Sequence, residues 1–139
     1  MIRAAAVVAT GDPFDTLPLD HEARHCRRAR VRTDGGHEVM VDLPHARHLH
    51  DGDRLVLDDG RRVLVRAAPE PVLDIATPDL ARIAWHLGNR HCPTQVLKGA
   101  LRIRADHVLA EMLRGLGCPL VERTAPFEPE HGAYHAHDH

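Results

Sequence analysis

The sequence predicts an α+β protein with a small all-β N-terminal domain, a ferredoxin-like C-terminal domain and a flexible histidine-rich tail. Three observations predict this arrangement. Short runs of alternating apolar and polar residues fill residues 1–68, a Pro-Glu-Pro break follows at 69–71, and beyond it apolar residues recur with a helical period. With 139 residues, 43% hydrophobic and 27% charged, the chain suits one or two small globular domains and excludes a large multidomain enzyme.

Two β-hairpins are predicted within residues 1–68. Residues 28–33 and 37–43 alternate on either side of Asp34-Gly35-Gly36, and residues 55–57 and 63–65 do so around Asp58-Asp59-Gly60. Asp-Gly pairs tolerate the positive φ that tight hairpin turns require. Residues 1–68 are therefore expected to form the all-β domain.

Residues 69–125 mix strand and helix. A strand at 72–76 is followed by Thr77 as N-cap, Pro78 at the first helical position and Gly88 as the helix end. The apolar stripe of this helix is Leu80, Ile83, Ala84 and Leu87.

Three further strands and a second helix complete this domain. The strands are expected at 95–97, 101–103 and 119–123, and Asp106 is the expected cap of a helix between the last two. The apolar face of that helix is Val108, Leu109, Met112, Leu113 and Leu116. The order β-α-β-β-α-β is that of the ferredoxin-like unit. Residues 126–139, rich in Pro, Glu, Gly and His, are expected to be a flexible tail.

Charge and composition exclude several classes of function. The formal net charge is -2 and aromatic residues make up 3%, so neither nucleic acid nor a membrane surface is an expected partner. The apolar run at residues 4–9 is too short for a signal peptide or a membrane span. Three widely spaced cysteines offer neither a disulfide framework nor a Cys-x-x-Cys pair, so a cytoplasmic location is expected.

The sequence has 13 histidines, an unusually high number for 139 residues. Since imidazole is the commonest metal ligand, these histidines are candidate metal ligands. His21-Glu22-Ala23-Arg24-His25 spells the zinc-peptidase pattern, which requires two histidines one turn apart on a helix and a catalytic glutamate. The segment has polar neighbours and room for hardly more than one helical turn. A zinc peptidase using His21, Glu22 and His25 is therefore only a distant alternative.

Two other histidine groups are candidate metal sites. His45, His48 and His50 form one, with His48 and His50 on one face if the segment is a strand; a solvated loop is the alternative. The tail supplies a second group that can chelate nickel, copper or zinc. Its members are His131, His135, His137 and His139.

Single histidines have plain structural explanations. His86 suits the last turn of its helix, and His107 can pair with Glu111 one turn on. His91, in a loop held by Gly88 and Pro93, is more often a hydrogen-bonded structural residue. In a twofold dimer, however, a histidine near the axis meets its own copy and becomes two ligands. The adjacent Cys92 is expected to point elsewhere and to be buried.

Several segments together resemble the urease accessory protein E family. They are Trp-His-Leu-Gly-Asn-Arg-His-Cys-Pro at 85–93, Asp-His-Val-Leu at 106–109 with Met-Leu-Arg-Gly-Leu-Gly at 112–117, and Ala-Pro-Phe-Glu-Pro-Glu at 125–130 before the histidine-rich end. Leu-Pro-Leu at 17–19, Arg-Ala-Arg-Val at 28–31, Leu-Pro at 43–44 and Gly-Asp at 52–53 extend the resemblance to the N-terminal half.

The resemblance implies a non-enzymatic nickel metallochaperone. It implies a homodimer in which His91 of both chains binds Ni²⁺, with tail histidines completing the coordination and His131 and His107 as possible auxiliary ligands. Zn²⁺ or Cu²⁺ can occupy the same kind of site. The implied recipients are the urease accessory GTPase and the urease apoprotein in their maturation complex. A nickel buffer or storage protein is the runner-up.

Overall fold

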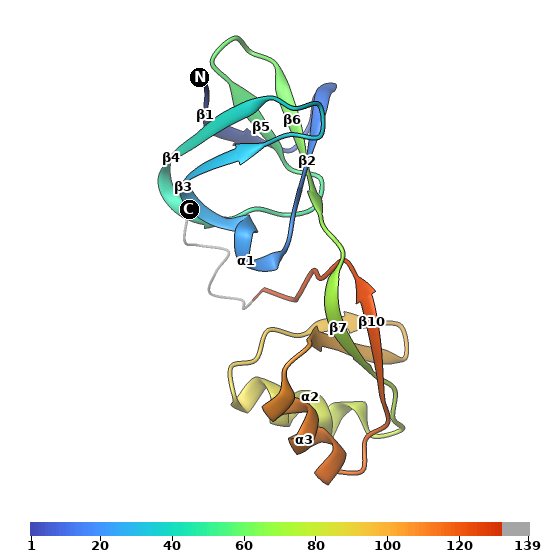
Figure 1. Ribbon diagram of the computed structural model, residues 1–139. Helices are drawn as coiled ribbons and strands as arrows, with labels where there is room; N and C mark the ends of the chain where they lie inside the picture. The colour runs from blue at the N-terminus through green and yellow to red at the C-terminus, as the bar shows by residue number, and fades with distance from the viewer. Residues whose placement is uncertain (132–139) are drawn as a thin grey trace. The chain divides into compact units, whose positions relative to one another are not determined.

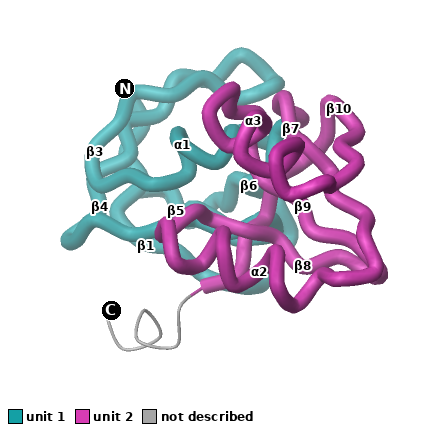
Figure 2. Tube along the Cα trace, turned by 90° about the horizontal axis from the view of Figure 1, so that it is seen from below, with its two compact units in different colours: residues 1–68, 139 teal, residues 69–138 magenta. Residues whose placement is uncertain are grey.

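The computed structural model describes residues 1–131 as two compact units, one formed by residues 1–68 and the other beginning at Pro69 (Figure 2). The mixed α+β class predicted from the sequence is confirmed. No helix among the described residues is long and apolar enough to cross a lipid bilayer.

Unit 1 is a curled six-stranded sheet with one short helix (Figure 1). Two of its pairs, β1–β4 and β2–β6, are parallel, and the others are antiparallel. The order across the sheet is β2-β6-β5-β1-β4-β3. The elements are β1 (Ile2–Val8), β2 (Pro13–Leu19), α1 (His21–Arg24), β3 (His25–Arg32), β4 (Glu38–His48), β5 (Arg54–Leu57) and β6 (Arg62–Ala67).

Both predicted hairpins are present in unit 1. In β3–β4, Arg30 lies opposite Met40, and in β5–β6, Leu55 lies opposite Val63. Alternate strand residues point inward and form one core. Its fully buried members are Ala4, Leu17, Val39, Val41, Leu43, Leu49, Leu55, Leu57, Val63 and Val65.

The β3–β4 turn is held by Asp15 of β2. Its carboxylate accepts hydrogen bonds from the backbone N–H groups of Thr16 at 2.8 Å and Gly35 at 3.0 Å, from the Thr33 hydroxyl, and contacts His37 Nδ1 at 2.8 Å. Gly35 comes so close that a Cβ there would lie 2.6 Å from Asp15 Oδ2. Glycine is needed at this position for the carboxylate to fit.

Unit 2 has the predicted β-α-β-β-α-β order. Its antiparallel sheet has the strand order β10-β7-β9-β8, which is that of a ferredoxin-like fold. The elements are β7 (Glu70–Ile75), α2 (Leu80–Asn89), β8 (Gln95–Leu97), β9 (Ala100–Arg104), α3 (His107–Gly115) and β10 (Leu120–Ala125).

The two helices cover one face of the unit 2 sheet (Figure 1). Leu73 and Ile75 of β7 pack there against Ile83 and Leu87 of α2 and Leu113 of α3. As predicted, Asp106 caps α3, and its carboxylate accepts from the Leu109 N–H at 2.9 Å.

Three details of the predicted helices are wrong. The Thr77 hydroxyl accepts from the Asp79 N–H at 3.4 Å, as an N-cap would, but the helix itself begins at Leu80. Gly88 lies inside α2 rather than ending it. The buried faces are also narrower than predicted, because each helix meets only one sheet. Ala84, Val108 and Leu116 are exposed.

The predicted start of the flexible tail at residue 126 is too early. Residues 126–130, here called the strap, lie across the sheet face opposite the helices (Figure 1). The Pro126 carbonyl accepts from Arg102 at 3.2 Å, the Glu128 N–H donates to Gln95 Oε1 at 2.9 Å, and the Glu130 N–H donates to the Thr94 carbonyl at 2.8 Å. Phe127 is fully buried.

Candidate metal centre

His91 occupies the left-handed position that ends α2. Its φ is 56°, and no other non-glycine residue among residues 1–131 has a positive φ. The His91 N–H donates to the Gly88 carbonyl at 3.0 Å and the Cys92 N–H to the Leu87 carbonyl at 3.0 Å. These two bonds form a Schellman motif, in which the left-handed residue is usually glycine. A histidine holds this strained position instead.

The motif sends neighbouring side chains in opposite directions. Cys92 packs against the apolar core beneath α2, whereas His91 is exposed to solvent. Burial raises the pKa of the Cys92 thiol, so the thiolate that binds metals is disfavoured there. Cys92 was predicted to be buried and to point away from His91, and the structure places it partly buried against that core.

The end of α2 favours a cation at His91. The partial negative charge at a helix C-terminus attracts positive ions. His86 lies in the last turn as predicted, and Trp85 beside it is 63% exposed. The exposed position leaves an ion bound to His91 open to exchange.

The end of the strap lies close to the loop that carries His91. Glu130, the residue before His131, is bonded to Thr94, which follows His91 by only three positions along the chain. His131 itself is exposed. His135, His137 and His139 lie outside the described residues.

His107 is a weaker candidate ligand. It is the first residue of α3, its side chain is 82% exposed, and its Nε2 lies 3.2 Å from Glu111 Oε1, the predicted surface pair. The Asp106 charge contributes to raising the pKa of the Cys92 thiol, which places the start of α3 near the His91 loop. A helix N-terminus disfavours cations, so the neighbouring dipole opposes metal binding here.

Within residues 1–131 no three His, Cys, Asp or Glu side chains converge as a ready-made metal site. A single imidazole at His91 does not make a tight site, because transition-metal sites in proteins have about four ligands. A tight site at His91 would need further ligands, such as those of another copy of the chain or of residues 132–139.

The zinc-peptidase motif does not have the required geometry. α1 is a single turn that ends at Arg24, and His25 is the first residue of β3. The two histidines therefore do not lie one turn apart on one helix, which the peptidase mechanism needs.

His21 and His25 meet histidines of the second predicted group instead. The ring centroid of His48 lies 4.8 Å from that of His21, 6.3 Å from that of His25 and 5.5 Å from that of His50. We call these four residues the histidine cluster. His45 is exposed and lies in β4 rather than in a loop. The sequence linked His48 with His50 but did not link either of them with His21 or His25.

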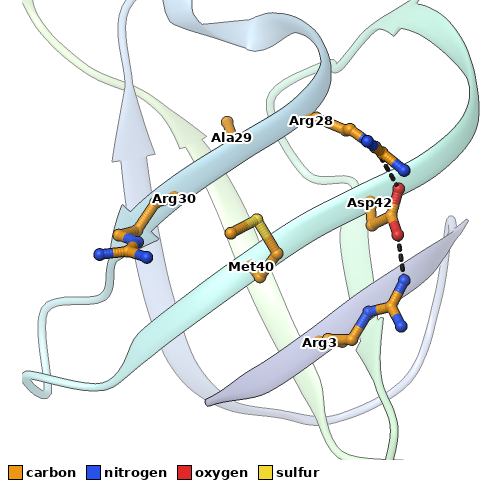
Figure 3. Close-up of a pocket in the computed structure, with 6 residues that line it drawn as sticks. All are labelled: Arg3, Arg28, Ala29, Arg30, Met40 and Asp42. Atoms are coloured by element: carbon orange, nitrogen blue, oxygen red, sulfur yellow. Dashed lines mark hydrogen bonds and ion pairs between the residues drawn. The ribbon is translucent and has the colours of Figure 1, made fainter.

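A hollow on the unit 1 sheet has different chemistry (Figure 3). It is lined by Arg3, Arg28, Ala29, Arg30, Met40 and Asp42. Arg28 and Arg3 both donate to the Asp42 carboxylate and lower its pKa. With three guanidinium groups and one carboxylate, the hollow offers no imidazole or thiolate to a transition-metal ion.

Comparison with known proteins covers both units. Residues 2–68 match the family model of the UreE urease accessory protein N-terminal domain, and residues 70–139 match that of its C-terminal domain. The urease accessory protein UreE of Chelativorans sp. (strain BNC1) is 50% identical over 143 aligned residues, which cover 100% of this chain and 90% of the relative.

Two further relatives carry the same name. The protein of Rhodobacter capsulatus is 47% identical over 147 residues, covering 100% of this chain and 94% of the relative. That of Rhodopseudomonas palustris (strain HaA2) is 56% identical over 123 residues, covering 86% of this chain and 57% of the relative.

Proposed function

The chain belongs to the UreE family of urease accessory proteins, and from this premise we propose that it is a nickel metallochaperone. It binds Ni²⁺ and delivers it for assembly of the urease metallocentre. The role is that of an accessory protein and needs no catalytic residue in this chain. Its recipients are the urease accessory GTPase and the urease apoprotein, reached in the cytoplasm.

The observation that carries this proposal is the placement of His91. An exposed imidazole sits where glycine is the favoured residue, at the end of a helix whose dipole attracts cations. Left-handed backbone at a non-glycine residue costs about 1–2 kcal/mol. A strained residue of this kind points to a role outside folding.

The site is completed by a homodimer. Two His91 imidazoles meet at a twofold axis, and His135, His137 and His139 supply the remaining ligands, with His131 or His107 as auxiliaries. Support for the tail ligands comes from the strap, since five residues of chain from Glu130 extend at most about 18 Å. The chain is therefore long enough for tail histidines to reach the loop that the Glu130–Thr94 bond holds. Neutral imidazoles also bind Zn²⁺ and Cu²⁺, so the occupation of the site by nickel depends on which metal ions are available.

Native mass spectrometry with Ni²⁺ at neutral pH tests the site. We expect a dimer whose first ion loads at one Ni²⁺ per two chains, and we expect His91→Asn to lose that ion. Asparagine is the chosen replacement because it tolerates left-handed backbone. The matched control is His86→Asn, in the last turn of α2, which should bind as the unmodified chain does.

A monomer that binds one Ni²⁺ per chain, or a His91→Asn variant that keeps the first ion, would contradict the shared site. Delivery is tested separately by incubating the nickel-loaded chain with purified accessory GTPase and urease apoprotein. Urease activation should depend on His91. A chain that binds nickel but activates no urease would be a buffer or storage protein.

A further inference from the structure

The histidine cluster of unit 1 gathers four imidazoles from separate parts of the chain. His21 comes from α1, His25 begins β3, His48 ends β4, and His50 lies just beyond it. His48 is the centre, with the other three ring centroids 4.8, 5.5 and 6.3 Å away. His21, His48 and His50 are half-buried and His25 is exposed.

The backbone fixes this gathering. His25 lies directly opposite His48 in the β3–β4 ladder, so both side chains project from the same face. Leu49 is fully buried, which turns His48 and His50 together toward the other side. The Leu49 N–H donates to the Arg24 carbonyl at 2.7 Å and ties this strand end to α1, which carries His21.

The ring spacings match those of imidazoles that share a transition-metal ion. A ligating nitrogen lies about 2.1 Å from the ion and the ring centroid about 1.1 Å further, so two ligands have centroids roughly 4.5 to 6.4 Å apart for angles of about 90° to 180° at the metal. All three distances to His48 fall in this range.

We propose that His21, His25, His48 and His50 form a second metal site, in unit 1 and independent of His91. Its donors are neutral nitrogens, which select Ni²⁺, Cu²⁺ or Zn²⁺ over Mg²⁺ or Ca²⁺. The nitrogens do not yet converge, since no group of three ligands in residues 1–131 is positioned for a metal. Rotation about the broad His χ2 torsion closes the site around an ion.

Two neighbouring arginines are directed toward other groups. Arg24 donates to the Leu19 carbonyl at 2.8 Å. Arg47 lies opposite Cys26 in the β3–β4 ladder, and this pair is the neighbour of the His25–His48 pair. The charge of Arg47 lowers the pKa of the Cys26 thiol, against the larger effect of burial. Strand alternation therefore places Arg47 on the opposite face from the cluster.

The test uses a full-length background in which His91 and the four tail histidines at 131, 135, 137 and 139 are all replaced by asparagine. This background removes the His91 site of the proposed function. A failure of the second metal site can therefore be distinguished from a failure of the proposed function. Cu²⁺ and Ni²⁺ are each titrated alone at neutral pH, with bound ions counted by native mass spectrometry. We expect one ion per chain.

His48→Ala in this background should lose that ion, whereas His45→Ala should keep it. His45 is the matched control because it lies in the same strand, three residues away and outside the cluster. The double variant His21→Asn/His50→Asn keeps the central histidine and should weaken Cu²⁺ binding at least tenfold. Circular dichroism checks that every variant is folded.

Electron paramagnetic resonance of the Cu²⁺ form supplies a second measurement. We expect hyperfine splitting from three or four imidazole nitrogens, lost in His48→Ala. A background chain that binds no ion, or a His48→Ala variant that binds as tightly as His45→Ala, would overturn the proposal.

Discussion

Asp15 is a nearly buried carboxylate that joins β2 to the β3–β4 turn. Burial by itself raises its pKa, but hydrogen bonds from Thr33, His37 and the N–H groups of Thr16 and Gly35 outweigh burial and lower the pKa to about 2. The ionised form is therefore the one that the folded chain stabilises.

Asp15→Asn should destabilise unit 1 by roughly 1–3 kcal/mol, because an amide cannot accept all of these bonds and brings N–H groups of its own. Because the folded pKa is below the ordinary value of 3.8, Asp15 contributes stability above about pH 4 and loses it as the pH falls toward about 2. Urea unfolding at pH 7 and pH 3 should show a smaller difference in Asp15→Asn than in the unmodified chain.

Asp59→Asn is the control for this experiment. Asp59 lies in the exposed β5–β6 turn, and its side chain bonds only to Arg61 within the described chain. Exposed pairs contribute little to stability, so this substitution should change the free energy of unfolding far less than Asp15→Asn does. Equal losses in both variants would contradict the assigned role of Asp15.

The hairpins were predictable because their signals are local. Alternation around Asp34-Gly35-Gly36 and Asp58-Asp59-Gly60 specifies both the strands and the turn between them. The end of α2 was not predictable, because His91 rather than a glycine takes the left-handed position of the Schellman motif, and the helix therefore continues past Gly88. The strap was missed because its sequence offers a single large apolar residue, Phe127, and nothing in the local pattern indicates that this residue is fully buried.

The strap is fastened to a charged sheet face. Arg102 forms a bidentate pair with Asp74, at 2.7 and 3.0 Å, and also donates to the Pro126 carbonyl. Arg123 contacts the same carboxylate at 3.0 Å. The hydrogen bonds from Arg102 are the largest cause of the lowered pKa of Asp74. One carboxylate thus orients the arginine that holds the strap.

Phe127→Ala should release the strap, because truncating a fully buried phenylalanine costs about 3–5 kcal/mol. Hydrogen exchange of the Glu128 and Glu130 amides, which now bond to Gln95 and Thr94, should accelerate more than that of β7. Phe127→Leu refills most of the volume and should restore much of the protection. Unchanged exchange in Phe127→Ala would mean that the hydrogen bonds alone hold the strap.

The whole molecule carries 13 histidines against a formal charge of -2, so complete protonation would bring the charge to -2 + 13 = +11. Unperturbed imidazole titrates near pH 6.5, and only the neutral form binds a metal. Acidification should therefore affect every imidazole site of the protein at once.

We expect bound Ni²⁺ to fall steeply between about pH 7.5 and pH 5.5. Equilibrium dialysis at fixed free Ni²⁺ measures the loss, and circular dichroism at each pH separates it from unfolding. Return to pH 7.5 should restore binding. Retention of nickel at pH 5.5 would indicate ligands other than imidazole.

Prediction of the candidate sites depended on whether their ligands are neighbours in the sequence. His91 and the tail lie in recognisable motifs. The histidine cluster joins residues 21 and 25 to residues 48 and 50 through the register of β3 and β4, which includes a bulge between Cys26 and Arg28. A one-residue shift in pairing reverses the face of every side chain, so this meeting cannot be derived from spacing.

The left-handed backbone at His91 lowers the stability of the fold, while the imidazole at this position serves the proposed nickel site. Glycine would adopt φ 56° without strain, and His91→Gly is the change that a search for a higher melting temperature would select. Proteins commonly trade stability for activity in this way. An engineered chain chosen only for heat resistance would discard the imidazole of the proposed nickel site.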